Sequence, residues 1–355
     1  MKNIIKTLIV MLTSISLFGS ANAGELSVSG TAKATYNIHS GVKTNQGKGL
    51  GITNELNFTA TGELDNGYTW SYSMELDPNA VSSGSNETAE NDDSKLTLTT
   101  PMGTVGVFIS EGGLDVEDAA SQSVYARPTD AGDPSSGTGD NFTIDAYNNF
   151  QYHMPADMLP FGIVGKIAYA PDLDTYGSGD NTGAIRTGTG LHGGYRSATE
   201  VQVKTAPIEN LAIGASYMEF SGSGVAKSNQ KPESGAYYAT YTAGPISIGY
   251  SKAYKAPGLA DGSLTSTTLV DYYEQTNTSI AYVNGDLSIS YEKEDDEKNM
   301  MRDATADVEQ ESSSIQVAYT MGGMTLAVAH GNYDNAGYVK DTEVDTMLFA
   351  VTMAF

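Results

Sequence analysis

The chain of 355 residues has no cysteine, a single tryptophan and only 19 lysine and arginine residues. Without cysteine it can form neither a disulfide nor a thiolate metal site. The 43 acids outweigh the bases and give a formal net charge of −24, which argues against nucleic acid as a partner. Beyond the N-terminal segment, the sequence also lacks any run approaching the about 20 apolar residues of a transmembrane helix. A helical membrane protein is therefore excluded.

Residues 1–23 have the pattern of a signal peptide. Lys2 and Lys6 precede an uncharged apolar run over 7–19, and Ala21-Asn22-Ala23 provides a small-x-small cleavage site. We expect this segment to be removed. Its removal takes two of the 19 bases and no acid, leaving 17 bases, 43 acids and a formal charge of −26. No linker or shift of composition divides the remainder, so we expect a single domain over 24–355.

Most of the mature chain alternates apolar and polar residues with a period of two, which is the pattern of β-strands. The segment 68–77 is the clearest case. Its apolar positions are Tyr68, Trp70, Tyr72, Met74 and Leu76. A soluble β-sandwich would alternate in the same way, so this pattern alone does not identify the solvent.

The lengths of the connections distinguish these cases, because short turns and long loops alternate along the chain. Short turns occur at 65–67, 101–103, 243–245, 284–286 and 322–323, whereas 78–93 and 111–141 are long. The sequence predicts about sixteen strands, an even number typical of transmembrane barrels. Such a sheet closes on itself because lipid offers no hydrogen bonds to a free edge. We therefore predict an all-β fold, a transmembrane antiparallel barrel whose polar face lines an aqueous channel.

Several strand limits follow from the same pattern. We expect strands at 143–153 and 188–206, and a strand at 287–295 that is followed by an acidic loop reaching Glu311. Tyrosines recur toward the strand ends, which suits the aromatic girdles at the two membrane interfaces.

The stretch 111–141 interrupts the alternation after the fifth predicted strand. It contains one base, Arg127, and seven acids: Glu111, Asp115, Glu117, Asp118, Asp130, Asp133 and Asp140. A connection of this length inside a compact fold is generally functional. We predict that it folds into the barrel as a filter. Acids at a narrowing attract cations and repel anions, and the proposed constriction acids are Glu111, Asp115, Glu117 and Asp118. The alternative for each of them is an ordinary solvated loop acid.

Over the whole mature chain, these features resemble the general porins of Gram-negative outer membranes, especially those of alphaproteobacteria. The resemblance rests on the signal segment, the strand count, the alternation of turns and loops, the long loop after the fifth strand and the terminal Phe355. It implies a water-filled channel for ions and small hydrophilic solutes, usually a homotrimer, surrounded by lipid and lipopolysaccharide. It also implies that the assembly machinery reads the last strand, in which Phe349, Val351, Met353 and Phe355 form an apolar row.

The resemblance further implies bases on the wall that faces the loop. The parity of the strands points four bases toward the lumen: Lys33, Lys95, Lys166 and Arg196. Arginines are scarce and do not cluster here, which departs from a strongly basic wall. We therefore expect a pore that favours cations.

No motif in the sequence indicates catalysis or a cofactor. The four histidines, His39, His153, His192 and His330, have no partner spacing that would suit a metal or a hydrolase. Weak binding of divalent cations by acidic outer loops is compatible with the negative charge. Two other functions remain open at this point, a substrate-specific channel and a surface structural or adhesion barrel.

Overall fold

The computed structural model describes residues 24–42, 46–78, 89–128, 140–173, 195–222, 228–260, 269–302 and 307–355. The predicted signal peptide, residues 1–23, lies outside the described residues, as do Asp130 and Asp133 of the acidic stretch. Within the described ranges, no helix is long and apolar enough to cross a membrane.

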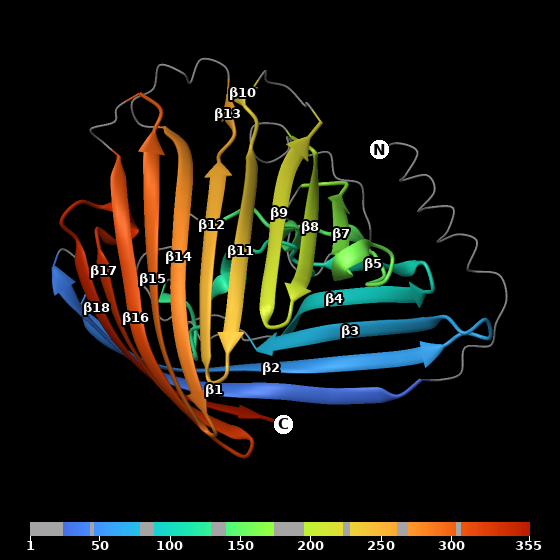
Figure 1. Cartoon of the computed structure of the whole chain (residues 1–355), viewed down its shortest axis with the longest axis horizontal. Coiled ribbons are helices and arrows are strands. Elements are labelled where there is room, and N and C mark those ends of the chain that lie inside the picture. Colours follow the sequence, from blue (N-terminus) through green and yellow to red (C-terminus); the bar gives the residue numbers. More distant parts are fainter. Residues whose placement is uncertain are drawn as a thin grey trace.

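Sixteen antiparallel strands form a closed barrel, which confirms the predicted fold class (Figure 1). They run in sequence order around the wall, and the last strand pairs with the first. The barrel strands are β1 (Leu26–Val42), β2 (Gly47–Glu63), β3 (Thr69–Pro78), β4 (Ala89–Thr100), β5 (Gly103–Ile109), β6 (Asn149–His153), β7 (Val164–Ala170), β8 (Ser197–Ile208), β9 (Leu211–Ser221), β11 (Glu233–Ala243), β12 (Ile246–Ala256), β14 (Val270–Asn284), β15 (Leu287–Met300), β16 (Val308–Met321), β17 (Met324–Asp334) and β18 (Glu343–Ala354). Two short strands, β10 (Ser228–Gln230) and β13 (Leu259–Ala260), pair separately from the barrel.

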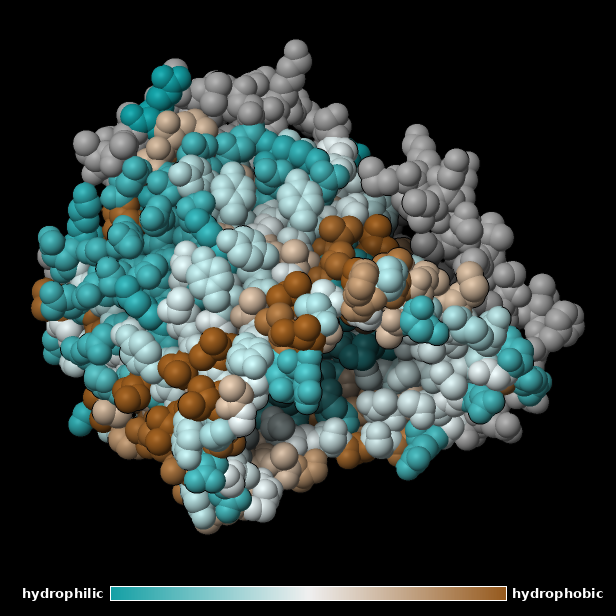
Figure 2. All heavy atoms as spheres, in the orientation of Figure 1, coloured by the Kyte–Doolittle hydropathy of each residue, from teal (hydrophilic) through white to brown (hydrophobic). Residues whose placement is uncertain are grey.

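The two faces of each strand meet different surroundings, and β15 shows this well. Leu287, Ile289 and Tyr291 are exposed on its outer face, whereas Glu292 and Glu294 on the opposite face are fully buried. This is the inverse of a soluble protein and is the arrangement expected of a barrel in lipid. Figure 2 shows the hydrophobic residues as a band that runs obliquely across the facing strands from the lower left to the right, with hydrophilic residues gathered above it at the upper left.

Tyrosines mark the outer face of many strands, and several, such as Tyr237 and Tyr250, lie in mid-strand rather than toward a strand end. The exposed ones are Tyr72, Tyr217, Tyr237, Tyr241, Tyr250, Tyr254, Tyr282, Tyr291 and Tyr319. Some of these rings neighbour one another across strands, as Tyr237 and Tyr250 do with centroids 6.5 Å apart.

The seam between β1 and β18 closes beside the end of the chain. The amide of Gly30 donates to the carbonyl of Phe355 at 2.8 Å, and the amide of Phe355 donates back to the carbonyl of Gly30 at 3.0 Å. A Cβ at position 30 would lie 2.8 Å from the Phe355 ring, so the missing side chain of Gly30 provides the space for that ring.

Three predicted strand limits are wrong. The segment 143–148 is not part of β6, because Ile144–Ala146 forms a 3-10 turn packed against the wall. The strand expected at 188–206 begins at Ser197, and residues 188–194 lie outside the described part. The acids after Asp295 do not form a loop as far as Glu311, since β15 continues to Met300 and β16 starts at Val308. Carboxylates fit these strands because both faces are polar there: one lines the lumen and the other lies beyond the apolar band.

The long connection between β5 and β6, residues 110–148, is called the inner loop below. Its described parts, 110–128 and 140–148, hydrogen-bond to side chains on the inner faces of the strands from β6 to β17. In Figure 1 it is the green trace behind β11–β15. The loop therefore follows the wall inside the barrel.

Candidate functional site: the inner loop and the lumenal wall

The inner loop begins at an ion pair between Glu111 and Lys95 of β4. Just beyond it, Gln151 of β6 donates to the Gly112 carbonyl, and Gln202 of β8 donates to the Leu114 carbonyl at 2.7 Å. Amide side chains of the wall thus hydrogen-bond to the backbone carbonyls of a loop segment that has no secondary structure of its own. One of the four predicted acids is therefore already paired with one of the predicted wall bases.

Asp115 is held by three donors rather than left in the lumen. Its carboxylate accepts from Ser216 Oγ at 2.9 Å, from Asn141 Nδ2 at 3.2 Å and from the Glu117 amide at 3.1 Å. Ser216 belongs to β9 and Asn141 to the returning half of the loop. Asp115 therefore joins the two halves of the inner loop to each other and to the wall.

The loop then makes a short 3-10 turn, Glu117–Ala120, whose backbone lies directly on the wall. The hydroxyls of Ser251 and Ser279 each donate at 2.7 Å, to the carbonyls of Glu117 and Ala120 respectively. A Cβ at Gly249 of β12 would overlap the Ala120 carbonyl, so only glycine permits this close approach.

Arg127 is the centre of the most strongly charged part of the loop. Its side chain is 7% exposed and ion-pairs with Asp118. Its guanidinium nitrogens also lie 4.0 Å from Glu117, 3.7 Å from Asp140 and 3.9 Å from Glu294 of β15. One buried base therefore holds both halves of the loop against the wall through four carboxylates.

The wall beside this cluster is itself acidic, because Glu292, Glu294 and Asp296 follow one another on the inner face of β15. Ser121 and Ser123 of the loop each donate to Glu292 Oε2 at 2.6 Å. Asn277 of β14 donates to both Glu292 and Glu294. These carboxylates are anchors for the loop.

The first described part of the inner loop, 110–128, ends against β16–β18 and reaches β1. Gln316 accepts from the Tyr125 amide at 2.9 Å, and Tyr333 donates to the Pro128 carbonyl at 2.6 Å. Val124 and Tyr125 pack on a small apolar cluster of the inner wall that includes Leu348. The Lys33 ammonium of β1 lies 5.6 Å from the centre of the Tyr125 ring, within the range of a cation–π contact.

The returning half fills the lumen in front of β7–β9. Phe142 exchanges two hydrogen bonds with Ser234, and the Ile144 amide donates to Glu200 at 2.9 Å. An apolar cluster forms around Leu114 and Ile144, with Phe142 set edge-on to Phe220 at 5.0 Å between centroids. This side of the barrel is therefore occupied by protein.

Burial raises the pKa of Glu117 well above its usual range, and the neighbouring charges of Asp115 and Asp118 raise it further, while Arg127 opposes them. Burial likewise raises the pKa of Asp145. Of the four predicted acids, only Asp118 combines a paired base with substantial exposure, since 54% of its side chain is accessible. It is the acid of the four best placed to act on ions in the lumen.

The two remaining predicted wall bases lie away from the loop acids. Lys166 of β7 neighbours His153 and Gln202 on the inner face. It lies near the turn end of the barrel, the end at which short turns join the strands; long loops join them at the other end, the loop end. Arg196 is exposed and directly precedes β8 at the loop end. The structure thus brings Lys33 and Lys95 to the inner loop but not Lys166 or Arg196.

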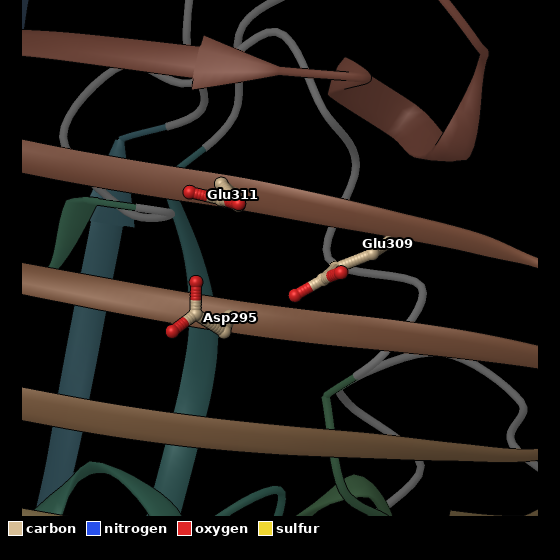
Figure 3. Close-up of side chains that lie close together, drawn as sticks. All are labelled: Asp295, Glu309 and Glu311. Carbon is tan, nitrogen blue, oxygen red and sulfur yellow. The ribbon is translucent and has the colours of Figure 1, made fainter.

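On the outer face of β15 and β16, Asp295, Glu309 and Glu311 turn their carboxylates toward one another (Figure 3). Lys293 supplies part of the counter-charge, at 2.7 Å from Asp295 and 3.1 Å from Glu311. This group belongs to the polar zone beyond the apolar band and does not face the lumen.

The sequence reasoning missed the charged residues that anchor the loop. Arg127 was noted as the one base of the acidic stretch, but its role depends on contacts with Glu294, far away in sequence. A usable signal did exist on β15, because Ser290 and Glu292 are already inward by parity, and the same parity extends to Glu294 and Asp296.

Comparison with known proteins agrees with this architecture. The model of the Gram-negative porin family matches residues 9–355. A search of curated proteins finds no match. Among solved structures, the chain is similar to OmpF of Salmonella typhi in complex with daunomycin, with a TM-score of 0.64, 11% identity and coverage of 95% of this chain and 100% of that one.

Two further structures show the same fold. One is OmpT of Vibrio cholerae lacking its loop L8, with a TM-score of 0.60, 13% identity and coverage of 94% of this chain and 100% of that one. The other is a mutant of the Rh. blastica porin, with a TM-score of 0.58, 13% identity and coverage of 93% and 100%. The family match over nearly the whole chain and the closed barrel of sixteen strands lead to one conclusion: this chain belongs to the Gram-negative porins, the non-enzymatic β-barrel channels of the outer membrane.

Proposed function

We propose that this porin is a channel for the passive diffusion of ions and small hydrophilic solutes and that it favours cations. The inner loop sets both the size limit and the charge preference of the channel. The main support for this proposal is the series of hydrogen bonds between the loop and the inner wall, from Gln151 on β6 to Tyr333 on β17. A loop held at so many points narrows the lumen as a fixed lining. Solutes pass between this lining and the opposite wall.

That opposite wall, formed by β1–β4, is rich in hydroxyl groups. Its lumenal side chains include Thr35, Thr53, Thr59, Ser71, Ser73 and Thr97, together with Lys33 and Lys95. Lys95 is neutralised by Glu111, and Glu55 and Glu75 share the lumenal face, so this wall carries no excess of positive charge. The loop side contributes Asp118 and the acids around Arg127. Acids at a narrowing favour cations, and the opposite wall does not offset them.

The test is the reversal potential of single channels in a potassium chloride gradient. A variant in which Glu111, Asp115, Glu117 and Asp118 are all neutral should lose most of its cation preference. As a matched control, Glu297→Gln removes the same kind of charge from the exposed outer face of β15 and should leave the preference unchanged. An unchanged preference in the neutral variant, or chloride preference in the wild type, would contradict the proposal.

We also propose that the barrel works as a homotrimer in contact with lipopolysaccharide, after insertion by the outer-membrane assembly machinery. Membership of the porin family supports the trimer. The paired hydrogen bonds of Phe355 with Gly30 support a role for the last residue in completing the barrel. The expected mass of the detergent-extracted particle is three chains, and a monomer that conducts normally would contradict the trimer.

The acidic group Asp295, Glu309 and Glu311 supports weak binding of divalent cations at the level of the lipopolysaccharide head groups. Carboxylate oxygens suit calcium and magnesium. Titration of the purified barrel with calcium should show weak binding that falls in Glu309→Gln/Glu311→Gln, and equal binding in this variant would refute the assignment.

A further inference from the structure

Two neighbouring lysines on the inner wall form no ion pair with a carboxylate among the described residues. Lys166 is the third residue of β7, and Lys204 lies on β8, where it pairs with Val164. Both point into the lumen, since Lys166 shares its face with buried Ala168 and Lys204 shares its face with buried Gln202. In a chain with 43 acids and 19 bases, an adjacent pair of lumenal lysines without a direct ion pair calls for an explanation.

The register places the two ammonium groups close together. Lys166 pairs directly with Gln202, two residues from Lys204 on the same face of β8. Diagonal neighbours of this kind are about 7–8 Å apart, and flexible lysine side chains can converge over that distance. His153 of β6 is the direct partner of Lys166 on the other side.

The sheet leaves room for this arrangement. Lys204 leans across β9 toward Tyr238 of β11, with its ammonium 5.9 Å from the centre of that ring. Between them lies Gly214, where a Cβ would meet Tyr238 at 2.6 Å and Lys204 at 3.0 Å. The absence of a side chain at position 214 therefore lets Lys204 lie beside the Tyr238 ring, which is itself buried against Val116 and Ala120 of the inner loop.

The nearby loop carboxylate is occupied elsewhere. Asp115 accepts from Ser216 and Asn141, and Ser216 lies two strands from Lys166 in the same row of the sheet. Two strand spacings amount to about 10 Å, and water in the lumen screens the attraction of Lys166 to Asp115 over that distance. Lys204 is nearer, because its partner Gly214 lies two residues from Ser216, and Asp115 offsets part of its charge. One carboxylate faces two ammonium groups, so the lysine pair keeps a net positive charge.

We propose that Lys166 and Lys204, with Tyr238 and His153 beside them, form a subsite for small multivalent oxyanions such as phosphate at the turn end of the lumen. This inference rests on the proposed channel function and adds a ligand class to it. Ammonium groups bind phosphate as point charges. An oxyanion entering from the turn end reaches this subsite before it meets the carboxylates of the inner loop, whereas one entering from the other end must pass them first.

The test is single-channel recording in potassium chloride with inorganic phosphate added to one chamber at a time. We expect phosphate to lower or interrupt the current from one chamber much more than from the other. In Lys166→Gln/Lys204→Gln the half-blocking concentration should rise about tenfold or more, because two charges that attract a doubly charged anion are lost. The charge-preserving Lys166→Arg/Lys204→Arg variant should retain the block.

The matched control is Lys252→Gln, which removes one base from the outer face of β12, where it pairs with Glu274. It should leave the phosphate block unchanged. Equal block from both chambers, or a block that persists in the double glutamine variant, would overturn the oxyanion subsite while normal conductance still upheld the channel. A wild type that gives no conductance in potassium chloride would instead defeat the proposed function itself.

Discussion

Replacing Arg127 tests how the inner loop is held. In Arg127→Gln the side chain keeps some polarity but loses its charge beside Glu117, Asp118, Asp140 and Glu294. Glu117 and Glu294 are buried, so they keep little hydration of their own. Asp118 and Asp140 remain partly in water and lose much less.

The magnitude follows from the buried members of this group. Removing one partner of a buried ion pair typically costs about 3–5 kcal/mol. The two exposed acids contribute about 1 kcal/mol or less each, and the raised pKa of Glu117 favours its neutral form, which lowers the cost on that side. We therefore expect the attachment of the loop to weaken by about 3 kcal/mol, which corresponds to roughly a 150-fold change in the equilibrium between attached and detached loop.

Single-channel recording and limited proteolysis can measure this change. Arg127→Gln should show larger current fluctuations and faster cleavage within 110–148, while the barrel itself stays folded because the strand pairing is untouched. The current fluctuations and cleavage rate of Arg127→Lys should lie between those of the wild type and of Arg127→Gln, since lysine keeps the charge without the guanidinium fork. If the current trace and cleavage rate of Arg127→Gln equal those of the wild type, the ion cluster does not hold the loop.

Four further outcomes follow from the same contacts. Asp118→Asn should reduce the cation preference in a salt gradient more than Glu117→Gln does, because Asp118 is exposed and Glu117 is buried with a raised pKa; the reverse order would exclude Asp118 as the selective acid. Because the folded pKa of Glu117 is above its ordinary 4.5, the folded state binds the extra proton, and the stability of the loop attachment should fall as pH rises from 4.5 through the raised pKa. Limited proteolysis of the loop as a function of pH measures this change. Glu117→Gln should flatten the pH dependence of the cleavage rate, and an unchanged slope would assign the pH dependence to another group. Ser121→Ala/Ser123→Ala should weaken the loop by about 3 kcal/mol through the lost donors to Glu292, measured by the same cleavage assay, with wild-type cleavage as the refuting result. Phe355→Ala should lower the fraction of chains that reach the folded, heat-modifiable barrel on gels, and normal assembly would exclude a role for its ring.

Much of the fold could be predicted from the sequence because a membrane barrel constrains each strand locally. Lipid requires every second residue to be apolar, as in Leu287, Ile289 and Tyr291. This period of two can be recognised in the sequence without knowledge of any partner strand. The prediction failed where that constraint ends. Beyond Tyr291 the outer face leaves the apolar band, so the acids from Asp295 onward resembled a loop although they continue the strand.

The site was less predictable, since its contacts join residues that are far apart in the chain. The acids of the inner loop were visible as a cluster, but Glu111 pairs with Lys95 and Glu117 is buried, which no local pattern indicates. Lys204 was missed because its neighbour Lys166 becomes adjacent only through the register of β7 with β8. Sequence patterns report which face a side chain takes, whereas charge compensation depends on the register.

The path of the inner loop divides the circumference of the cylinder into two arcs with different tolerance for change. Along one arc, serines, glutamines and carboxylates of the wall are committed to supporting the loop, so substitutions there alter its position. Along the other arc, the threonines and serines of β1–β4 line the passage as a separate surface. That second arc is where new solute preferences can be introduced, by design or by natural variation, without disturbing the scaffold that keeps the channel narrow.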